Sequence, residues 1–445
     1  MRMATRALTG LVPVFALHLA TARAESPDGG PPDSSTATAP DGGTATPATT
    51  TPAAVDADAA TPELTPEELA ELAAATGSDS AAVKPLPETP KGGGAGQSLN
   101  PDIAVITDVV LGWFNTDSPL QVGGHDPAEN GFSLQQVELA IGKAVDPYFR
   151  MDANLVFGHD GVEVEEAFAT TLALPHSLQV RAGQFLTRFG RLNNTHLHAW
   201  DFVDQPFALS RVFGGEGNRG VGAELSWLTP LSWYVELVGS ASEARGEGTT
   251  RSFLGEADVD EDSPLDFEYV LAAKQFFALS DNWSLAWGLS WATGPNPSGD
   301  STRSDIFGTD IFLKYRPITY GSHTVVSLQT EALYRRRQVP DDTLQDVNGY
   351  AQLFWRFAQR WGTAARYEYG TGAYSADGAR VPDPLDPFWT GLRQRTSAAI
   401  TFWPTEFSRL RLQASADFLQ WQDKPNLAAF LALEFNAGAH GAHAF

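Results

Sequence analysis

Apolar and polar residues alternate along many segments of about ten residues between Pro101 and Phe445. In segment 283–291 (WSLAWGLSW), the odd positions are Trp or Leu and the even positions are Ser, Ala or Gly. Segments 221–227 and 410–418 repeat this period, and the polar set of the latter is Arg, Gln, Ser and Asp. A period of two places successive side chains on opposite faces of a β-strand. One face of these strands therefore meets an apolar medium, and the other meets small or polar groups.

The same alternation predicts sixteen strands. Their connections are alternately short and long, and the long ones cover roughly 115–131, 189–217, 242–266, 294–302, 337–345 and 371–392. Short turns at one end and long loops at the other are typical of outer-membrane barrels. The predicted strands are 102–114, 132–145, 147–157, 161–174, 177–188, 218–228, 231–241, 267–279, 282–293, 303–316, 322–336, 346–358, 360–370, 393–403, 407–420 and 426–437.

The predicted fold class is therefore all-β, a transmembrane antiparallel β-barrel of about sixteen strands, with fourteen as an alternative. A barrel of sixteen strands is too wide for side chains to fill and leaves an aqueous channel. A soluble sandwich gives no reason for the alternating connection lengths. Aromatic residues near the short turns are expected to form a girdle at the membrane interface: Tyr148, Trp227, Trp233, Trp283, Trp361 and Trp403.

The first hundred residues differ in composition from the rest. Residues 1–24 have basic Arg2 and Arg6, an apolar stretch and an Ala-Arg-Ala end, which predicts a signal peptide. Residues 25–100 are rich in Ala, Thr, Pro and Asp, which predicts a disordered periplasmic linker. Thr65, Pro66 and Glu68 predict a short helix near 65–75 within it. The barrel then occupies 101–445, and the predicted location is a Gram-negative-type outer membrane.

Composition excludes several functions. The chain has no cysteine, so disulfides, thiolate metal sites and a catalytic Cys are excluded. A net charge of −24 argues against a nucleic-acid partner. No His is expected at an outward strand position beside a Ser, so the chain is not predicted to be an enzyme. No cofactor is predicted.

The long loop between the fifth and sixth predicted strands, 191–218, is the one expected to fold into the lumen and constrict it. Its polar side chains can offer charge and hydrogen bonds to a passing solute. The alternative is that they hold an extracellular loop in place. The candidates are Arg191, His196, His198, Asp201, Asp204 and Arg211.

Alternation also predicts charged residues on the inward faces of the strands. Arg366, Arg393, Arg395, Arg409 and Arg411 lie on three neighbouring predicted strands and form a basic wall. Opposed charges across a constriction orient dipolar solutes, and the alternative is that these groups bind one another and stiffen the barrel. The residues expected to face the basic wall, or to line the lumen beside it, are Glu163, Glu165, Glu224 and Arg181.

Two histidine pairs are the weak candidates for a metal site. They are His196 with His198 and His440 with His443. Imidazole is a common zinc ligand, but histidine pairs in exposed loops are usually incidental. No metal site is therefore predicted from the sequence.

Several motifs resemble a known porin family. Segments 180–190 (VRAGQFLTRFG), 219–225 (RGVGAEL), 349–353 (GYAQL) and 366–368 (RYE) resemble the family of the phosphate-selective porins O and P. Segments 393–395 (RQR), 403–411 (WPTEFSRLR) and 438–443 (GAHGAH) are more similar to a porin-like branch often labelled zinc-regulated outer-membrane receptors. The resemblance implies a passive porin, although phosphate selectivity in that family rests on Lys and Arg clusters, whereas this barrel is acidic overall.

The predicted function is passive diffusion of small hydrophilic solutes or ions through a water-filled barrel, with weak cation preference. Alternatives are a zinc-uptake receptor-like barrel and a structural barrel that anchors the periplasmic tail. The expected partners are outer-membrane lipid and lipopolysaccharide, the transported solutes or ions and the barrel-assembly machinery, with a homotrimer as the candidate assembly.

Overall fold

A computed structural model describes residues 101–117, 119–158, 161–244, 251–255, 257, 263–319 and 322–438. The predicted signal peptide, linker and short helix near 65–75 lie outside these residues, as do His440 and His443. What was predicted for these segments and for the two histidines stays a prediction.

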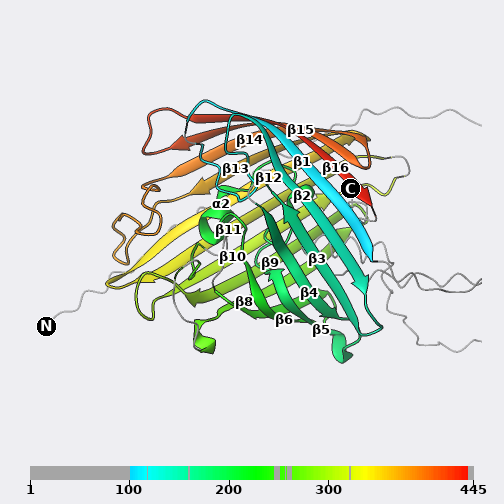
Figure 1. Cartoon of the computed structure of the whole chain (residues 1–445), viewed down its shortest axis with the longest axis horizontal. Helices are drawn as coiled ribbons and strands as arrows, with labels where there is room; N and C mark the ends of the chain where they lie inside the picture. Colours follow the sequence, from blue (N-terminus) through cyan, green and yellow to red (C-terminus); the bar gives the residue numbers. More distant parts are fainter. Residues whose placement is uncertain are drawn as a thin grey trace, which may run out of the picture. The chain divides into compact units, whose positions relative to one another are not determined.

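Sixteen antiparallel strands form a closed barrel, which confirms the predicted fold and strand number (Figure 1). Closure comes from β1, which pairs with β2 on one side and with β16 on the other. The strands are β1 (Asp102–Phe114), β2 (Gly131–Ala144), β3 (Phe149–Phe157), β4 (Val162–Thr171), β5 (Leu178–Leu186), β6 (Arg219–Leu228), β7 (Tyr234–Ser242), β8 (Glu268–Ser280), β9 (Trp283–Pro295), β10 (Arg303–Tyr315), β11 (Val325–Val339), β12 (Asp342–Ala358), β13 (Trp361–Gly370), β14 (Arg393–Thr405), β15 (Ser408–Leu419) and β16 (Asn426–Gly438).

The alternating pattern sorts side chains between the outer and inner faces of the barrel. On β9, Trp287 and Leu289 are 38% and 45% exposed, whereas Ala286 and Ser290 are 4% and 7% exposed. A β-strand directs neighbouring side chains to opposite faces. The outer face is therefore apolar, and the polar groups are gathered inside, where they are largely buried.

Strands β11 and β12 are longer than predicted. Segment 337–345 was expected to be a long loop, but β11 continues to Val339 and β12 begins at Asp342. Arg335, on β11, lies inside the barrel with its Nε 2.9 Å from Asp346 of β12. Outward positions at the end of β11, such as the exposed Arg336, are polar as well as inward ones, and this hid the alternating pattern.

Five of the six aromatic residues predicted for the girdle are exposed near the short turns, and Trp403 is the exception. Tyr148, Trp227, Trp233, Trp283 and Trp361 are between 39% and 63% exposed near the short turns. Trp403 instead packs edge-on against Phe354, with ring centroids 6.3 Å apart, and the Arg356 guanidinium lies 4.8 Å from the centroid of its ring.

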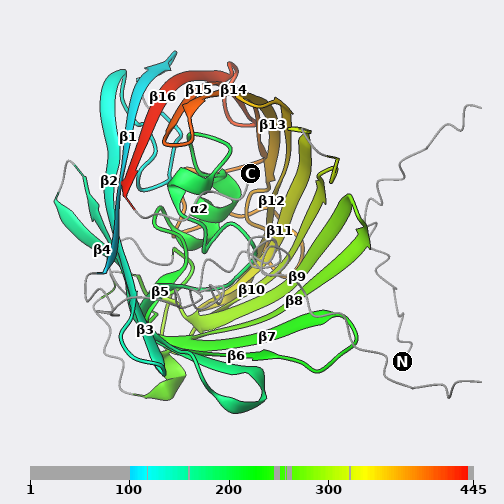
Figure 2. The same cartoon turned by 90° about the vertical axis from the view of Figure 1, so that its right-hand side faces the viewer.

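The connection between β5 and β6, residues 187–218, lies inside the barrel, and we call it the inner loop. It contains the short helices η2 (Leu197–Ala199) and α2 (Phe207–Phe213). Figure 2 shows α2 within the ring of strands. All seven residues of α2 are buried, and its five apolar residues pack with Phe189, Phe253 and Trp389 in an apolar core inside the barrel. None of the helices in the described part of the chain is long and apolar enough to cross a membrane.

Candidate functional site

The five arginines of the basic wall come together on β13, β14 and β15, as alternation predicts. Neighbouring strands are paired in register, with Glu368 opposite Arg395 and Arg395 opposite Asp417. Acidic side chains thus lie among the arginines. Four of the five, Arg366, Arg393, Arg395 and Arg411, are at most 3% exposed.

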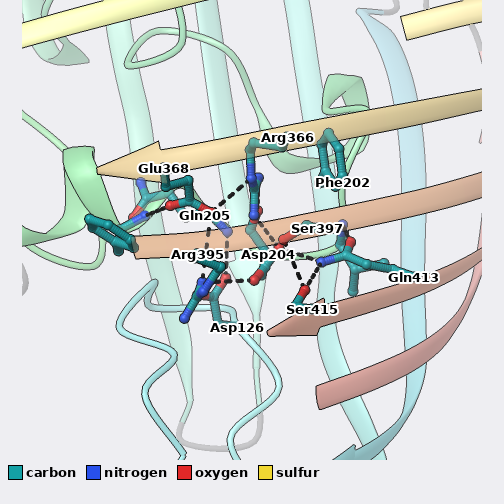
Figure 3. Close-up of polar contacts among 12 residues, drawn as sticks. Asp126, Phe202, Asp204, Gln205, Arg366, Glu368, Arg395, Ser397, Gln413 and Ser415 are labelled. Carbon is teal, nitrogen blue, oxygen red and sulfur yellow. Dashed lines mark hydrogen bonds and ion pairs between the residues drawn. The ribbon is translucent and has the colours of Figure 1, made fainter. Parts of the chain in front are cut away.

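Asp204 of the inner loop is the centre of one ion-pair cluster against this wall (Figure 3). Its Oδ1 lies 2.5 Å from Arg366 Nη2, and its Oδ2 lies 3.0 Å from Arg395 Nη1. Gln413 Nε2 donates a 2.7 Å hydrogen bond to Oδ1. Burial by itself raises the pKa of Asp204, but the charges of Arg366 and Arg395 outweigh it and lower that pKa. Asp204 is therefore held as a carboxylate.

Arg409 and Arg411 of β15 bind the backbone of the inner loop. Arg409 donates to the carbonyl oxygens of His198 at 2.6 Å and Trp200 at 3.0 Å. Arg411 donates to those of Trp200 at 2.9 Å and Phe202 at 2.7 Å. These donors satisfy carbonyls that a buried loop would otherwise leave unpaired. Holding the inner loop against the barrel is thus the structural role that these contacts give the two arginines.

The start of α2 is fixed to the same wall. The backbone N–H of Phe207 donates a 2.6 Å hydrogen bond to Glu368 Oε2 of β13. Arg393 Nη2 donates to the carbonyl of Leu120, and its Nε lies 2.8 Å from Asp417 Oδ1. The loop after β1 is therefore tied to the wall beside the inner loop.

The predicted acidic residues do not form an unpaired bank. Glu224 forms ion pairs with Arg181 at 3.0 Å and with Arg188 at 2.9 Å, and all three side chains are at most 5% exposed. Glu163 forms an ion pair with Arg219. Arg188 and Arg219, which the sequence analysis did not select, therefore form ion pairs with the predicted acidic residues.

Glu165 lies in a β-bulge. The pairing of β3 with β4 shifts between Asn154 and Leu155, so that Glu165 is the extra residue between Val164 and Glu166. Glu165 and Glu166 consequently both contact His196 of the inner loop, at 3.0 and 3.1 Å. Alternation alone had placed Glu166 on the outer face.

His196 and His198 lie side by side with their rings parallel and 5.7 Å apart. His198 Nδ1 lies 2.9 Å from Glu138 Oε2 of β2, a residue that the sequence analysis did not select. Burial lowers the pKa of His196, but the nearby charges of Glu165 and Glu138 and hydrogen bonds to Glu165 and Glu166 outweigh it, so the pKa is raised.

The other three loop candidates have different partners. Arg191 stacks over the ring of Phe312, 3.8 Å from its centroid. Asp201 accepts a 3.3 Å hydrogen bond from Gln352, and burial raises its pKa to about 6. Arg211 has no solvent-exposed surface; its guanidinium lies 4.0 Å from the ring centroid of Trp389, and burial lowers its pKa to about 10.

One known protein is similar in sequence over much of this chain. It is a protein of Aquifex aeolicus (strain VF5) described as an uncharacterized protein, 33% identical over 387 residues that cover 78% of this chain and 80% of the relative. The two chains belong to one family. No family profile matches this chain.

Solved structures share the fold of this chain at low sequence identity. The outer membrane channel DcaP of Acinetobacter baumannii has a TM-score of 0.54 and 11% identity, over 78% of this chain and all of that one. An anion-selective porin from Comamonas acidovorans has a TM-score of 0.50 and 9% identity, over 76% of this chain and 99% of that one. Structural similarity at such low sequence identity supports the porin-type barrel fold and no finer conclusion.

Proposed function

We propose that the chain is an outer-membrane channel for passive diffusion of small hydrophilic solutes or ions. The observation that carries this proposal is the closed sixteen-strand barrel with an apolar outer face and charged interior. An apolar outer face suits lipid, and a barrel of this size has room for water inside. The channel and porin identity of DcaP and the Comamonas protein agrees with it.

The inner loop is the proposed constriction. Its η2–α2 segment occupies part of the lumen and is held on β13–β15 by Arg366, Arg395, Arg409 and Arg411. A segment held by several charge-assisted hydrogen bonds keeps a fixed position. The pathway then runs past the inner loop.

The proposed selectivity is a weak preference for cations. The basic wall has acidic partners within it, because Asp204 and Asp417 bridge its arginines, and Arg409 and Arg411 share Glu434. Its guanidinium donors also bind loop carbonyls, which leaves fewer of them for a passing anion. The chain's net charge of −24 adds a negative potential that attracts cations. Phosphate-type anion selectivity is the rival.

Recording in planar bilayers tests both statements. Steady ohmic current steps without an energy-coupling partner are expected, and a tenfold salt gradient should give a reversal potential of cation sign. A barrel that stays closed contradicts the channel. An anion-sign potential that disappears in the double variant Arg409→Gln, Arg411→Gln supports the phosphate-type rival. The variant Arg303→Gln, outside the basic wall, is the matched control.

The proposal also covers the N-terminal region and the assembly of the chain. We infer that residues 1–24 direct export and that 25–100 form a periplasmic tail. The barrel-assembly machinery would insert the chain among lipid and lipopolysaccharide, and a homotrimer is the proposed assembly. Cross-linking in native membranes tests the trimer.

A further inference from the structure

Three carboxylates and two imidazoles meet where the inner loop contacts β2 and β4. Glu138 comes from β2, Glu165 and Glu166 come from β4, and His196 and His198 come from the inner loop. Their side chains are at most 13% exposed. Five buried groups that can bind a cation thus come from three separate segments of the chain.

The spacing of three donor atoms in this group suits a metal ion. Donor atoms of Glu138, Glu165 and His196 all lie within 4.8 Å of one another. His196 Nδ1 is 3.0 Å from Glu165 Oε2 and 3.9 Å from Glu138 Oε1. Tetrahedral zinc with ligands at its usual bond lengths separates neighbouring donor atoms by about 3.3 Å. The two distances lie on either side of that value.

The other nitrogen of the His196 ring has an orienting partner. His196 Nε2 lies 3.1 Å from Glu166 Oε2 and 3.0 Å from the side-chain amide nitrogen of Asn154. Histidines that bind metals usually donate their second ring N–H to a carboxylate or carbonyl, which fixes the tautomer and the ring orientation. Glu166 is placed to hold His196 with Nδ1 directed at Glu138 and Glu165.

Backbone irregularities bring these groups together. The bulge at Glu165 directs two consecutive glutamates of β4 to the inner loop. A second register shift, between β1 and β2, makes Gln135 the extra residue three positions before Glu138. Bulges interrupt the hydrogen-bond ladder and are frequent where a strand must re-aim a side chain. Both strands that supply carboxylates have one.

The alternative is an ordinary group of ion pairs. Elsewhere in the barrel, buried carboxylates such as Glu224 and Asp417 are each shared by two arginines. Glu165 and Glu166 instead share the single ring of His196. A divalent cation compensates several carboxylates at once, and mixed imidazole and carboxylate ligands suit zinc-like ions better than Mg²⁺ or Ca²⁺.

We propose that Glu138, Glu165 and His196 bind a divalent transition-metal cation of the Zn²⁺ type. Glu166 is the positioning residue for His196, and His198 contacts the second oxygen of Glu138. The bound cation links β2, β4 and the inner loop, on a different part of the barrel wall from β13–β15, which hold the loop through the Asp204 cluster. This site does not depend on the proposed channel function.

Cation loading of the full chain in detergent tests the proposal. The protein is stripped of metal with a chelator, loaded with Zn²⁺ or Co²⁺ and then desalted. We expect it to retain one cation per chain, and Co²⁺ should give visible d–d absorption bands. His196→Gln and Glu165→Gln should lose the bands. Glu166→Gln should weaken binding about tenfold to a hundredfold, as removal of an orienting partner does. The variant His176→Gln changes an exposed histidine and should bind as the unchanged protein does.

A second measurement keeps the test decisive if a variant does not fold. X-ray absorption of the zinc-loaded native protein should show nitrogen and oxygen ligands with imidazole scattering. Oxygen-only coordination overturns the proposal, as does zinc retention that is equal in the folded His196→Gln and Glu165→Gln variants. Failure of the native protein to retain any cation overturns it as well, whatever the bilayer recordings show.

Discussion

Asp204 and Arg395 are 191 residues apart in the sequence and form an ion pair inside the barrel, with Asp204 Oδ2 3.0 Å from Arg395 Nη1. Arg366 binds the other carboxylate oxygen. One aspartate therefore bridges two buried guanidinium groups. It joins the inner loop to β13 and β14 at a single point.

Replacing Asp204 with Asn should release the inner loop from the barrel wall. Two buried arginines would lose their shared anion, and breaking a buried ion pair in this way costs about 3–5 kcal/mol. Urea unfolding in lipid should show the loss, and single-channel conductance should become larger or noisier. Asp300→Asn, at an exposed position between β9 and β10, is the control and should change neither. Unaltered conductance in Asp204→Asn would show that the loop does not limit the channel.

Replacing Phe213 with Ala should loosen α2. Phe213 has no solvent-exposed surface and packs edge-on against Phe189, with ring centroids 4.9 Å apart. Truncating a buried Phe costs about 3–5 kcal/mol, which favours local opening of the inner loop by a factor of roughly a hundred or more. Hydrogen exchange of the amides in 207–213 should accelerate accordingly. Leu265→Ala, at a side chain that is 74% exposed, should leave that exchange unchanged.

The contact between His125 and Glu216 should make stability depend on pH. His125 Nε2 lies 3.3 Å from Glu216 Oε2 and joins the loop after β1 to the inner loop. Burial lowers the pKa of His125, but its contact with the Glu216 carboxylate outweighs this and raises the pKa to about 9. The stabilisation is therefore complete below the unfolded value of about 6.5 and is lost as pH rises through about 9.

Unfolding free energies of the unchanged protein and of His125→Gln test that dependence. The difference between them should be on the order of 3 kcal/mol at about pH 6 and should vanish by about pH 10. His323→Gln, at an exposed histidine, is the matched control. A difference that stays constant over this range would mean that the charge of His125 does not contribute.

The outer face should tolerate apolar changes but not charge. Leu289 of β9 is 45% exposed and lies between the outward Trp287 and Trp291. An arginine at the midplane of the lipid-facing surface costs about 2–4 kcal/mol. Folding into lipid vesicles should therefore be impaired for Leu289→Arg and much less so for Leu289→Ala. Equal folding of the two variants would show that this face does not meet lipid.

The sixteen strands were predictable because alternation is a local property. Each strand such as β9 repeats its apolar face every two residues, whatever its neighbours do. The prediction was wrong at 337–345, where alternation is lost because the outward Arg336 and Gln338 are polar like the inward Arg337 between them. It was also wrong for Trp403, whose place near a turn suggested an outward ring.

The candidate site was less predictable, because its contacts depend on how distant segments meet. Alternation placed Arg409 and Arg411 inside, but not against the carbonyls of the inner loop. Glu166 was missed because a bulge changes which face a residue occupies, and the sequence pattern shows no sign of it. Glu138 was missed because its partner, His198, lies 60 residues away.

The sequence by itself determined the all-β barrel class, the outer and inner faces and the gathering of charge inside the barrel. These follow from the two-residue period, which each segment expresses independently. Only the tertiary structure decided that Asp204 would join Arg366 to Arg395 and that Glu138, Glu165 and His196 would meet. Such contacts depend on barrel closure, on two bulges and on the path of a buried loop, and none of these is encoded within a single segment.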